Sequence, residues 1–365
     1  MSDVAAAGRP APPPLTIVLP QRWRPEDVRE QSARGEIPTH IMLTLADELG
    51  GRVETAAELT PTRLDRLLGL VLGSDEVWAL AKKVTRGRSA DDLYYANSEE
   101  LGLAITVLQV LRRRPTRRVG FYLQVPDGQR IRWWLQLISL LRLDPMIVVT
   151  TPNTYDGAER FLRRRGRRIA LLRSPLDLDF FAATRKSAGN PRPLLASAGM
   201  ERRDYTTLLA AVAEMDVDVV VCAVSQNAKQ SSASFPDTVP DNVSFEPLSM
   251  AGLRDLYQRA DATIVACLPN TIDAGTTVAI EAGACGCPLL VSHTSGLVDY
   301  VEEGVAADAG TGDPAAMRAA IQRVLDSPDE TQAMSQRGLQ RIRDRYAASV
   351  FHDRFIRLVY PALQD

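Results

Sequence analysis

Two carboxylates that stand eight positions apart, Asp273 and Glu281, are the residues of this chain whose types and spacing best suit ligand chemistry. Between them lie a glycine, two threonines and an apolar run. The pattern predicts a strand over 262–268, a loop over 269–275 and a helix over 276–284. A loop that leads into a helix presents free backbone N–H groups and the positive end of the helix dipole, which suits a phosphate.

Glu281 follows Thr277 by one helical turn, so both side chains can face one ligand. A carboxylate at that depth can accept hydrogen bonds from ribose hydroxyls, as acidic residues do in other nucleotide sites. We interpret the segment as a site for a ligand that combines a sugar, a diphosphate and a ribose, laid across the start of a helix.

The segment resembles the acid-x7-acid motif of the retaining, nucleotide-sugar-dependent glycosyltransferases of family 4, which have the GT-B fold. The usual pattern is Glu, a glycine-containing loop, and then Glu-Ala-x-Ala-x-Gly-x-Pro. Residues 281–288 read E-A-G-A-C-G-C-P, a close match. The first acid is Asp273 where the family usually has Glu, which shortens the reach of the carboxylate by one methylene group.

A second segment, residues 197–212, reads S-A-G-M-E-R-R-D-Y-T-T-L-L-A-A-V and resembles the family's phosphate-facing loop and helix start. The resemblance implies that Arg203 contacts the donor diphosphate, with Arg202 as the neighbouring candidate and Gly199 in the same loop. A guanidinium can hold two phosphate oxygens at once. Alone, R-R-D would suit a solvated helix start, but the motif downstream favours the phosphate role.

The resemblance also implies the remaining donor contacts. Residues 242–249 resemble the strand and turn whose backbone meets the nucleotide base, with contacts at Glu246 and Leu248. The catalytic set that it implies is Arg203, Asp273 and Glu281, and the donor sugar would be held by Asp273 or by the backbone of Ala274, Gly275, Thr276 and Thr277.

The first half of the chain resembles the family only in architecture. A single glycine, Gly35, followed by His40 stands where the family often has a Gly-Gly loop and a helix, and Gln124 stands where many members have a histidine. We take these three residues as acceptor-side candidates, although for His40 an ordinary helix residue is the favoured interpretation and an acceptor or phosphate contact is the alternative. Because the chain has only 3 histidines, a histidine-based general acid is not expected.

Strands and helices alternate throughout, which is typical of parallel α/β architecture. Residues 186–193, K-S-A-G-N-P-R-P, have the composition of a linker. The resemblance implies the GT-B fold, with two doubly wound Rossmann-like domains that face a cleft. The predicted parts are a disordered tail (1–14), an acceptor-side domain (15–185), a nucleotide-sugar-binding domain (193–345) and a C-terminal helix that packs back on the first domain (346–365).

At 365 residues, with 45% hydrophobic and 24% charged residues, the chain is predicted to be globular and long enough for two domains. Its formal net charge of −2 gives no global attraction to nucleic acid or anionic membranes. The 4 cysteines lie in apolar contexts, so we expect reduced thiols and neither a metal site nor a disulfide.

Three further patterns have two interpretations each. Residues 133–143, with two tryptophans, could dock on a membrane surface, but a buried amphipathic helix is favoured. The arginine runs at 112–118 and 163–168 follow helix ends, which favours helix capping over nucleic-acid binding. Asn97 with Glu100 predicts a capping box ahead of a helix over 101–112.

The first fourteen residues lack a basic stretch followed by an apolar core, so no signal peptide is expected. The sequence therefore predicts a cytoplasmic, bacterial, retaining glycosyltransferase of the hexosyltransferase type. A peripheral position at the inner face of the membrane is the less favoured alternative. A nucleoside-diphosphate sugar is the donor, no cofactor is required, and the acceptor is a glycan, a lipid-linked molecule or a small natural product.

Two alternatives stay open at this point: a noncatalytic or degenerate nucleotide-sugar-binding protein, and a phosphorylase or sugar synthase of the same fold. The substitution at Asp273 and the missing histidine motivate the first alternative. The sequence does not identify the acceptor, the sugar, the nucleotide, the linkage or the oligomeric state.

Overall fold

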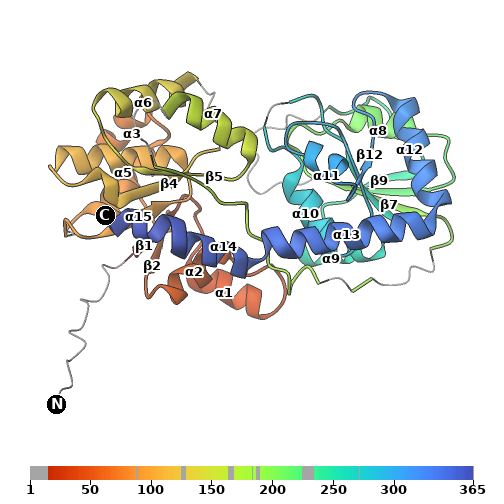
Figure 1. The fold of residues 1–365 in the computed structure, drawn as a ribbon, viewed down its shortest axis with the longest axis horizontal. Coiled ribbons are helices and arrows are strands. Elements are labelled where there is room, and N and C mark those ends of the chain that lie inside the picture. Colours follow the sequence, from red (N-terminus) through yellow and green to blue (C-terminus); the bar gives the residue numbers. More distant parts are fainter. Residues whose placement is uncertain are drawn as a thin grey trace, which may run out of the picture.

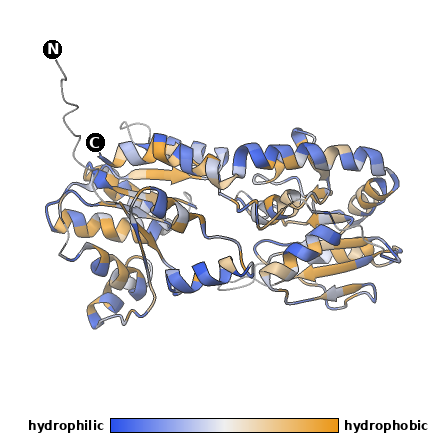
Figure 2. Ribbon diagram, turned by 90° about the horizontal axis from the view of Figure 1, so that it is seen from below, coloured by the Kyte–Doolittle hydropathy of each residue, from blue (hydrophilic) through white to orange (hydrophobic). Residues whose placement is uncertain are grey.

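The computed structural model describes residues 15–87, 89–124, 129–162, 168–182, 184–185, 190–223, 234–270 and 272–364. Within these residues, two parallel sheets of 6 strands each lie side by side along the long axis of the molecule (Figure 1). The strands are short apolar runs, such as the fully buried Leu15–Leu19 and Met146–Val149, as expected for parallel sheets that helices cover on both faces. Figure 2 shows hydrophobic strands inside each domain and helices with hydrophilic outer surfaces.

The first sheet has the strand order β2-β1-β3-β4-β5-β6. The chain runs from β1 outward to β2 and then returns to β3 on the other side of β1, which creates a topological switch point between β1 and β3. Its strands are β1 (Leu15–Leu19), β2 (Arg52–Thr55), β3 (Leu93–Ala96), β4 (Val119–Tyr122), β5 (Met146–Val149) and β6 (Ile169–Leu171). The connecting helices are α1 (Pro25–Ala33), α2 (Ile41–Glu48), α3 (Arg63–Gly69), α4 (Asp75–Thr85), α5 (Glu99–Leu111), the short 3-10 helix η1 (Thr116–Arg118), α6 (Gln129–Leu140) and α7 (Pro152–Leu162).

The second sheet has the order β12-β11-β10-β7-β8-β9, with its switch point between β7 and β10. Segments that follow these two strands therefore meet at one edge of the sheet. Its strands are β7 (Leu194–Ala198), β8 (Asp218–Cys222), β9 (Val243–Phe245), β10 (Ala262–Val265), β11 (Leu289–Val291) and β12 (Ala307–Asp308). The helices are α8 (Tyr205–Val212), α9 (Met250–Arg259), α10 (Thr276–Ala284), α11 (Val298–Glu302), α12 (Pro314–Asp326) and α13 (Pro328–Tyr346).

The C-terminal segment crosses back to the first domain (Figure 1). Helix α13 ends at Tyr346, Ala347 has an extended backbone, and Tyr346 accepts a hydrogen bond from the backbone N–H of Leu176 at 2.7 Å. Beyond this break follow α14 (Ala348–Arg354), the π-helix η3 (Phe355–Val359) and α15 (Tyr360–Gln364). Their apolar residues complete a core with β1, β3 and β5, and these are Phe351, Phe355, Val359, Tyr360 and Leu363. The predicted fold class, two doubly wound domains with a C-terminal crossover, is confirmed.

One local prediction was wrong. The N-cap of α5 is Ser98, whose hydroxyl accepts from the N–H of Leu101 at 3.5 Å, and the helix begins at Glu99. Asn97 cannot cap it, because its own N–H still extends the sheet ladder to the carbonyl of Val18 at 3.0 Å. The C-terminal helix predicted over 346–365 begins after Ala347, which pairs with Leu176, and residues 348–364 are helical throughout, with the π-helical stretch at Phe355–Val359.

The arginine runs hold helix ends and the loops after them. Arg112 is the C-cap of α5 and donates to the carbonyl of Thr85 at 2.6 Å. Arg168 donates to the carbonyl of Asp144 at 2.6 Å, whereas residues 163–167 of the second run lie outside the described residues.

Trp134 is buried and Trp133 is exposed. Within the described ranges, no helix combines the length and the apolar character that crossing a bilayer requires.

Candidate functional site

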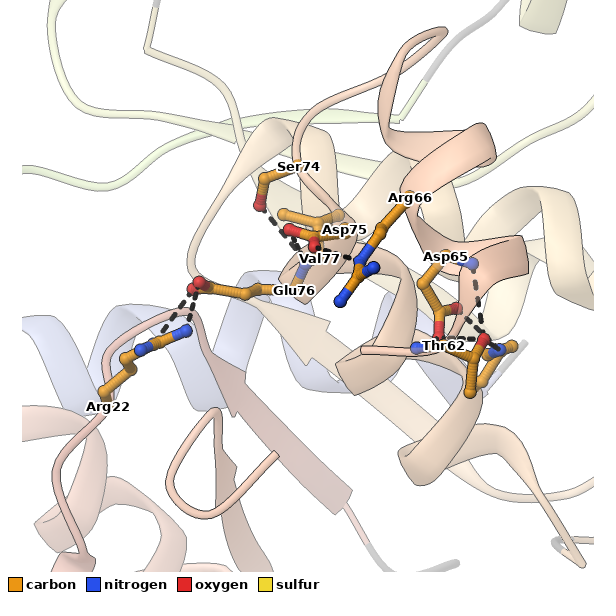
Figure 3. Close-up of polar contacts among 9 residues, drawn as sticks. Arg22, Thr62, Asp65, Arg66, Ser74, Asp75, Glu76 and Val77 are labelled. Atoms are coloured by element: carbon orange, nitrogen blue, oxygen red, sulfur yellow. Dashed lines mark hydrogen bonds and ion pairs between the residues drawn. The ribbon is translucent and has the colours of Figure 1, made fainter. Parts of the chain in front are cut away.

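A cavity of about 950 Å³ lies between the two domains at the carboxyl ends of their strands. Both switch points open into it, as ligand sites in doubly wound sheets do. On the first domain it is bounded by segments after β1, β3 and β4, and on the second by segments after β7, β8 and β10 together with α10. Glu76, at the start of α4, lines its rim and is ion-paired with the exposed Arg22 (Figure 3).

The loop after β7 carries the predicted phosphate-binding arginine. Arg203 is only 3% exposed and lines the cavity. Its Nε donates to the carbonyl of Ala198 at 2.7 Å and its Nη1 to the carbonyl of Glu201 at 2.8 Å. Gly199 has φ +91°, and a Cβ there would lie 2.5 Å from Arg203 Nη2. Glycine is therefore required for the guanidinium to lie against this loop, whereas Arg202 is exposed and is not a lining residue.

Helix α10 begins at the edge of the same cavity. Its N-cap is Gly275, with φ +96°, so no side chain caps the first turn. A Cβ at this position would lie 2.8 Å from carbons of both Leu297 and Val265. The tight packing brings the helix start, including Thr277, to the cavity wall. The backbone N–H groups of the first turn then provide an anion-binding position.

Glu281 lies one turn further along α10 and also lines the cavity. Its side chain is 8% exposed, and burial raises its pKa from 4.5 to about 8, although the positive charge of Arg203 acts in the opposite direction. The carboxyl therefore keeps its proton to a much higher pH than an ordinary glutamate does. Hydroxyl donors from a ligand would favour the charged form.

Asp273 connects the two domains. Its Oδ2 accepts a hydrogen bond from Thr150 Oγ1, at the end of β5, at 3.1 Å. Burial raises the pKa of Asp273, and hydrogen bonds from Thr151 and Thr150 oppose this rise. A second contact across the cleft runs from Asn153 Nδ2 to the carbonyl of Ser295 at 2.9 Å. The Asp273 carboxylate thus lies in the wall of the cavity, at a point where residues of both domains meet.

Of the other predicted donor contacts, some line a cavity and others do not. Leu248 lines the cavity beside Cys222, whereas Glu246 is exposed, accepts from Ser244 Oγ at 3.0 Å and is not a lining residue. Ala274 is buried beneath the helix start. Thr276 donates to the carbonyl of Gly296 at 3.3 Å and lines a smaller adjoining cavity of about 150 Å³.

Of the acceptor-side candidates, Gln124 lines the main cavity and its N–H donates to Glu99 Oε2 at 2.8 Å. His40 occupies the N-cap position of α2 without a capping side-chain hydrogen bond, and it lines a second cavity, of about 340 Å³, that adjoins the first. Gly35, at the end of α1, lines neither cavity. Sequence reasoning missed Tyr122 and Thr150, although a polar residue at the end of a buried parallel strand is a readable signal for such a position.

Metal ligands do not gather in the part of the chain that the structure describes, where no three His, Cys, Asp or Glu side chains form a group. The four cysteines are buried and unpaired, and these are Cys222, Cys267, Cys285 and Cys287.

The comparisons with known proteins agree with this geometry. Residues 203–354 match a family model described as glycosyl transferase-like. D-inositol 3-phosphate glycosyltransferase of Thermobispora bispora is 34% identical over 99 residues, which are 27% of this chain and 22% of that protein.

Solved structures show the same two-domain fold at low sequence identity. Sucrose-phosphate synthase of Thermosynechococcus elongatus is 16% identical, with a TM-score of 0.67 over 94% of this chain and 98% of that chain. The α,α-trehalose 6-phosphate synthase of Burkholderia multivorans is 16% identical, with a TM-score of 0.69 over 97% and 98%. Anabaena Alr3699/HepE, solved with UDP and glucose, is 13% identical, with a TM-score of 0.63 over 94% and 98%. The predicted resemblance is confirmed over residues 203–354, and the chain has the two-domain GT-B fold of these solved structures.

Proposed function

We propose that this protein is a retaining glycosyltransferase that moves a sugar from a nucleoside-diphosphate sugar to a hydroxyl-bearing acceptor. One observation carries the proposal: Arg203, the uncapped start of α10 and Glu281 line a single cavity at the switch point of the second domain. Arg203 and the helix start suit a diphosphate, and Glu281 suits the hydroxyls of a ribose. Alr3699/HepE, which has the same fold, was solved in complex with UDP and glucose, which supports such a donor.

The diphosphate would lie between Arg203 and the first turn of α10. When the bond between the anomeric carbon and the phosphate oxygen breaks, its electron pair leaves on the diphosphate. Arg203 is held by two backbone carbonyls before any ligand arrives, so it needs little reorganisation to stabilise that charge. The charge is met by these fixed groups, and the proposal requires no cofactor.

The nucleoside would occupy the part of the cavity near Leu248 and Cys222, with its ribose hydroxyls donating to Glu281. The donor sugar would then reach Asp273 and the backbone beside Gly275. Thr150 already donates to Asp273 from the opposite domain, so a sugar held there would contact both sides of the cleft. Retention of the anomeric configuration is the outcome that the family resemblance implies.

The first test is calorimetric titration with UDP-, GDP-, ADP- and dTDP-glucose. One nucleotide should bind clearly more tightly than the others. With that nucleotide, Arg203→Ala should lose about 1.5–3 kcal/mol of binding free energy, the usual contribution of hydrogen bonds to a charged group. Arg202→Ala, at the exposed neighbour, is the matched control and should retain affinity.

Binding without turnover would favour the noncatalytic alternative, and phosphate-dependent release of a sugar phosphate would favour the phosphorylase. No binding by any of the four donors, or equal affinity of the two arginine variants, would refute the donor assignment. Once an acceptor is found, the anomeric proton coupling of the product in NMR distinguishes retention from inversion.

A further inference from the structure

A second cavity of about 340 Å³ lies on the side of the cleft where the two chain crossings meet, and we call it the hinge pocket. It opens between the start of α2, the ends of β3 to β5, the segment after β6, α10 and α14. It shares Asn97, Tyr122, Thr277 and Glu281 with the main cavity, so a ligand in it would lie directly beside the proposed donor.

The walls of the hinge pocket are mainly apolar. Aromatic and aliphatic side chains from both domains form them, and these are Ile41, Met42, Tyr95, Val148, Leu172, Leu176, Phe181, Ile280 and Phe351. Most of these side chains also belong to the two cores that meet here. A hollow with such walls at a domain interface, with a few polar groups, has the size and composition of a site for a small organic molecule.

His40 is one of the polar groups in this pocket. Its ring packs edge-on against Trp23, with centroids 5.0 Å apart. Burial lowers the pKa of His40 from 6.5 to about 4, so the imidazole is neutral at pH 7. Its Nδ1 is buried and has no hydrogen-bond partner among the described residues. The His40 ring therefore adds no charge to the wall of the hinge pocket at pH 7.

The acidic groups in the described lining of the hinge pocket are Asp177 and Glu281, and this lining contains no Lys or Arg. Asp177 is already an acceptor, taking hydrogen bonds from the N–H groups of Thr39 at 2.7 Å and Phe180 at 3.1 Å. A phosphorylated ligand would therefore face carboxyl oxygens and apolar walls, at a large desolvation cost. An uncharged ligand with a ring or an aliphatic body would meet no such cost.

We propose that the hinge pocket binds the apolar body of the acceptor, and that the acceptor is a small, uncharged aromatic or alicyclic alcohol. This inference rests on the proposed glycosyl transfer. The acceptor oxygen forms the bond to the anomeric carbon, the bond from that carbon to the diphosphate oxygen breaks, and the hydroxyl proton leaves to the diphosphate or to solvent. The products are an O-glycoside and the nucleoside diphosphate.

The test uses umbelliferone, a planar fluorescent alcohol, as the probe and glucose 6-phosphate as the charged competitor. Ser174 lines the hinge pocket and is partly buried, so Ser174→Trp should fill it. Asp179→Trp places the same ring at an exposed position of the same segment and is the matched control. Umbelliferone should bind the unmodified protein and the control equally, and Ser174→Trp about tenfold or more weakly, a difference of about 1.4 kcal/mol.

Equal binding by Ser174→Trp, or displacement of umbelliferone by glucose 6-phosphate, would overturn the proposal. A second measurement needs no variant: in protein labelled at methionine methyl groups, umbelliferone should show nuclear Overhauser contacts to Met42, and their absence would overturn the proposal as well. UDP titration of the same samples distinguishes failure of the hinge-pocket proposal from failure of the proposed glycosyltransferase function. Umbelliferone binding without any nucleotide binding would retain the pocket and reject the transferase function.

Discussion

Replacement of Glu281 by glutamine should change how the stability of the protein depends on pH. The folded protein holds this carboxyl with a pKa of about 8, against 4.5 for the ordinary group, because it is buried. Between these two pH values the unfolded chain has lost the proton and the folded chain has kept it. The contribution of this proton to the free energy of unfolding is therefore fully present below pH 4.5 and is lost as the pH rises to about 8.

The size of the effect follows from the two pKa values. Each pH unit in this window costs about 1.4 kcal/mol, so the full loss attributable to Glu281 is about 5 kcal/mol. An amide cannot ionise, so Glu281→Gln should lack this slope. The variant should match the unmodified protein near pH 5 and exceed it by several kcal/mol near pH 8. Urea unfolding followed by circular dichroism across this range gives the difference between the two profiles.

The matched control is Glu302→Gln, at an exposed glutamate of α11. Other groups also titrate between pH 4.5 and 8, but they do so equally in the unmodified protein and in both variants. The comparison therefore uses only the differences between the three stability profiles. Parallel profiles for Glu281→Gln and the unmodified protein would refute the reasoning. Nucleotide binding adds a further check: hydroxyls that donate to Glu281 favour its charged form, so binding at pH 7 should release a proton, which calorimetry in buffers of different ionisation enthalpy detects.

Other expected outcomes concern the backbone, the helix caps and the hinge pocket. Gly275→Ala should cost about 1–3 kcal/mol of stability and weaken UDP binding, because an alanine at φ +96° is strained and its methyl group would lie 2.8 Å from two buried carbons; unchanged thermal unfolding would contradict this. Ser98→Ala should cost about 1 kcal/mol through loss of the α5 cap, and Asn97→Ala should leave that cap intact; equal losses in urea would be evidence against the assigned N-cap. The ring protons of His40 should not titrate in NMR near pH 6.5, because burial lowers its pKa to about 4; the stability that depends on the neutral ring is lost as the pH falls from 6.5 toward 4.

Local sequence signals were sufficient where one short segment determines both the structure and the ligand position. The predicted helix over 276–284 has the observed bounds of α10, because a glycine precedes it and Gly286 follows its last turn. Other local signals were present but were not used. Asp313 followed by Pro314 is the N-cap and first residue of α12, and Thr62 with Asp65 forms the capping box of α3 (Figure 3).

Contacts between distant segments could not be predicted from one sequence. Nothing near Asp273 indicates that Thr150, 123 positions away, donates to its carboxyl. Ala347 is a residue with high helix propensity, yet its backbone is extended because it pairs with Leu176 from the other crossing. In both cases the relative position of the two domains decides the local structure, and that position is not encoded in a short window.

The C-terminal crossover has a consequence for the order in which the protein is made. The face of the first sheet that contains Leu15 and Ile17 is covered partly by α2 and partly by Phe355, Val359 and Leu363, which are translated long after the sheet. At about 5–20 residues per second, the ribosome adds the residues between β6 and Leu363 in about 10–40 s. Throughout that time the part of this face that the C-terminal helices cover lacks its permanent partner. The first domain can therefore complete its core only after the second domain has been synthesised.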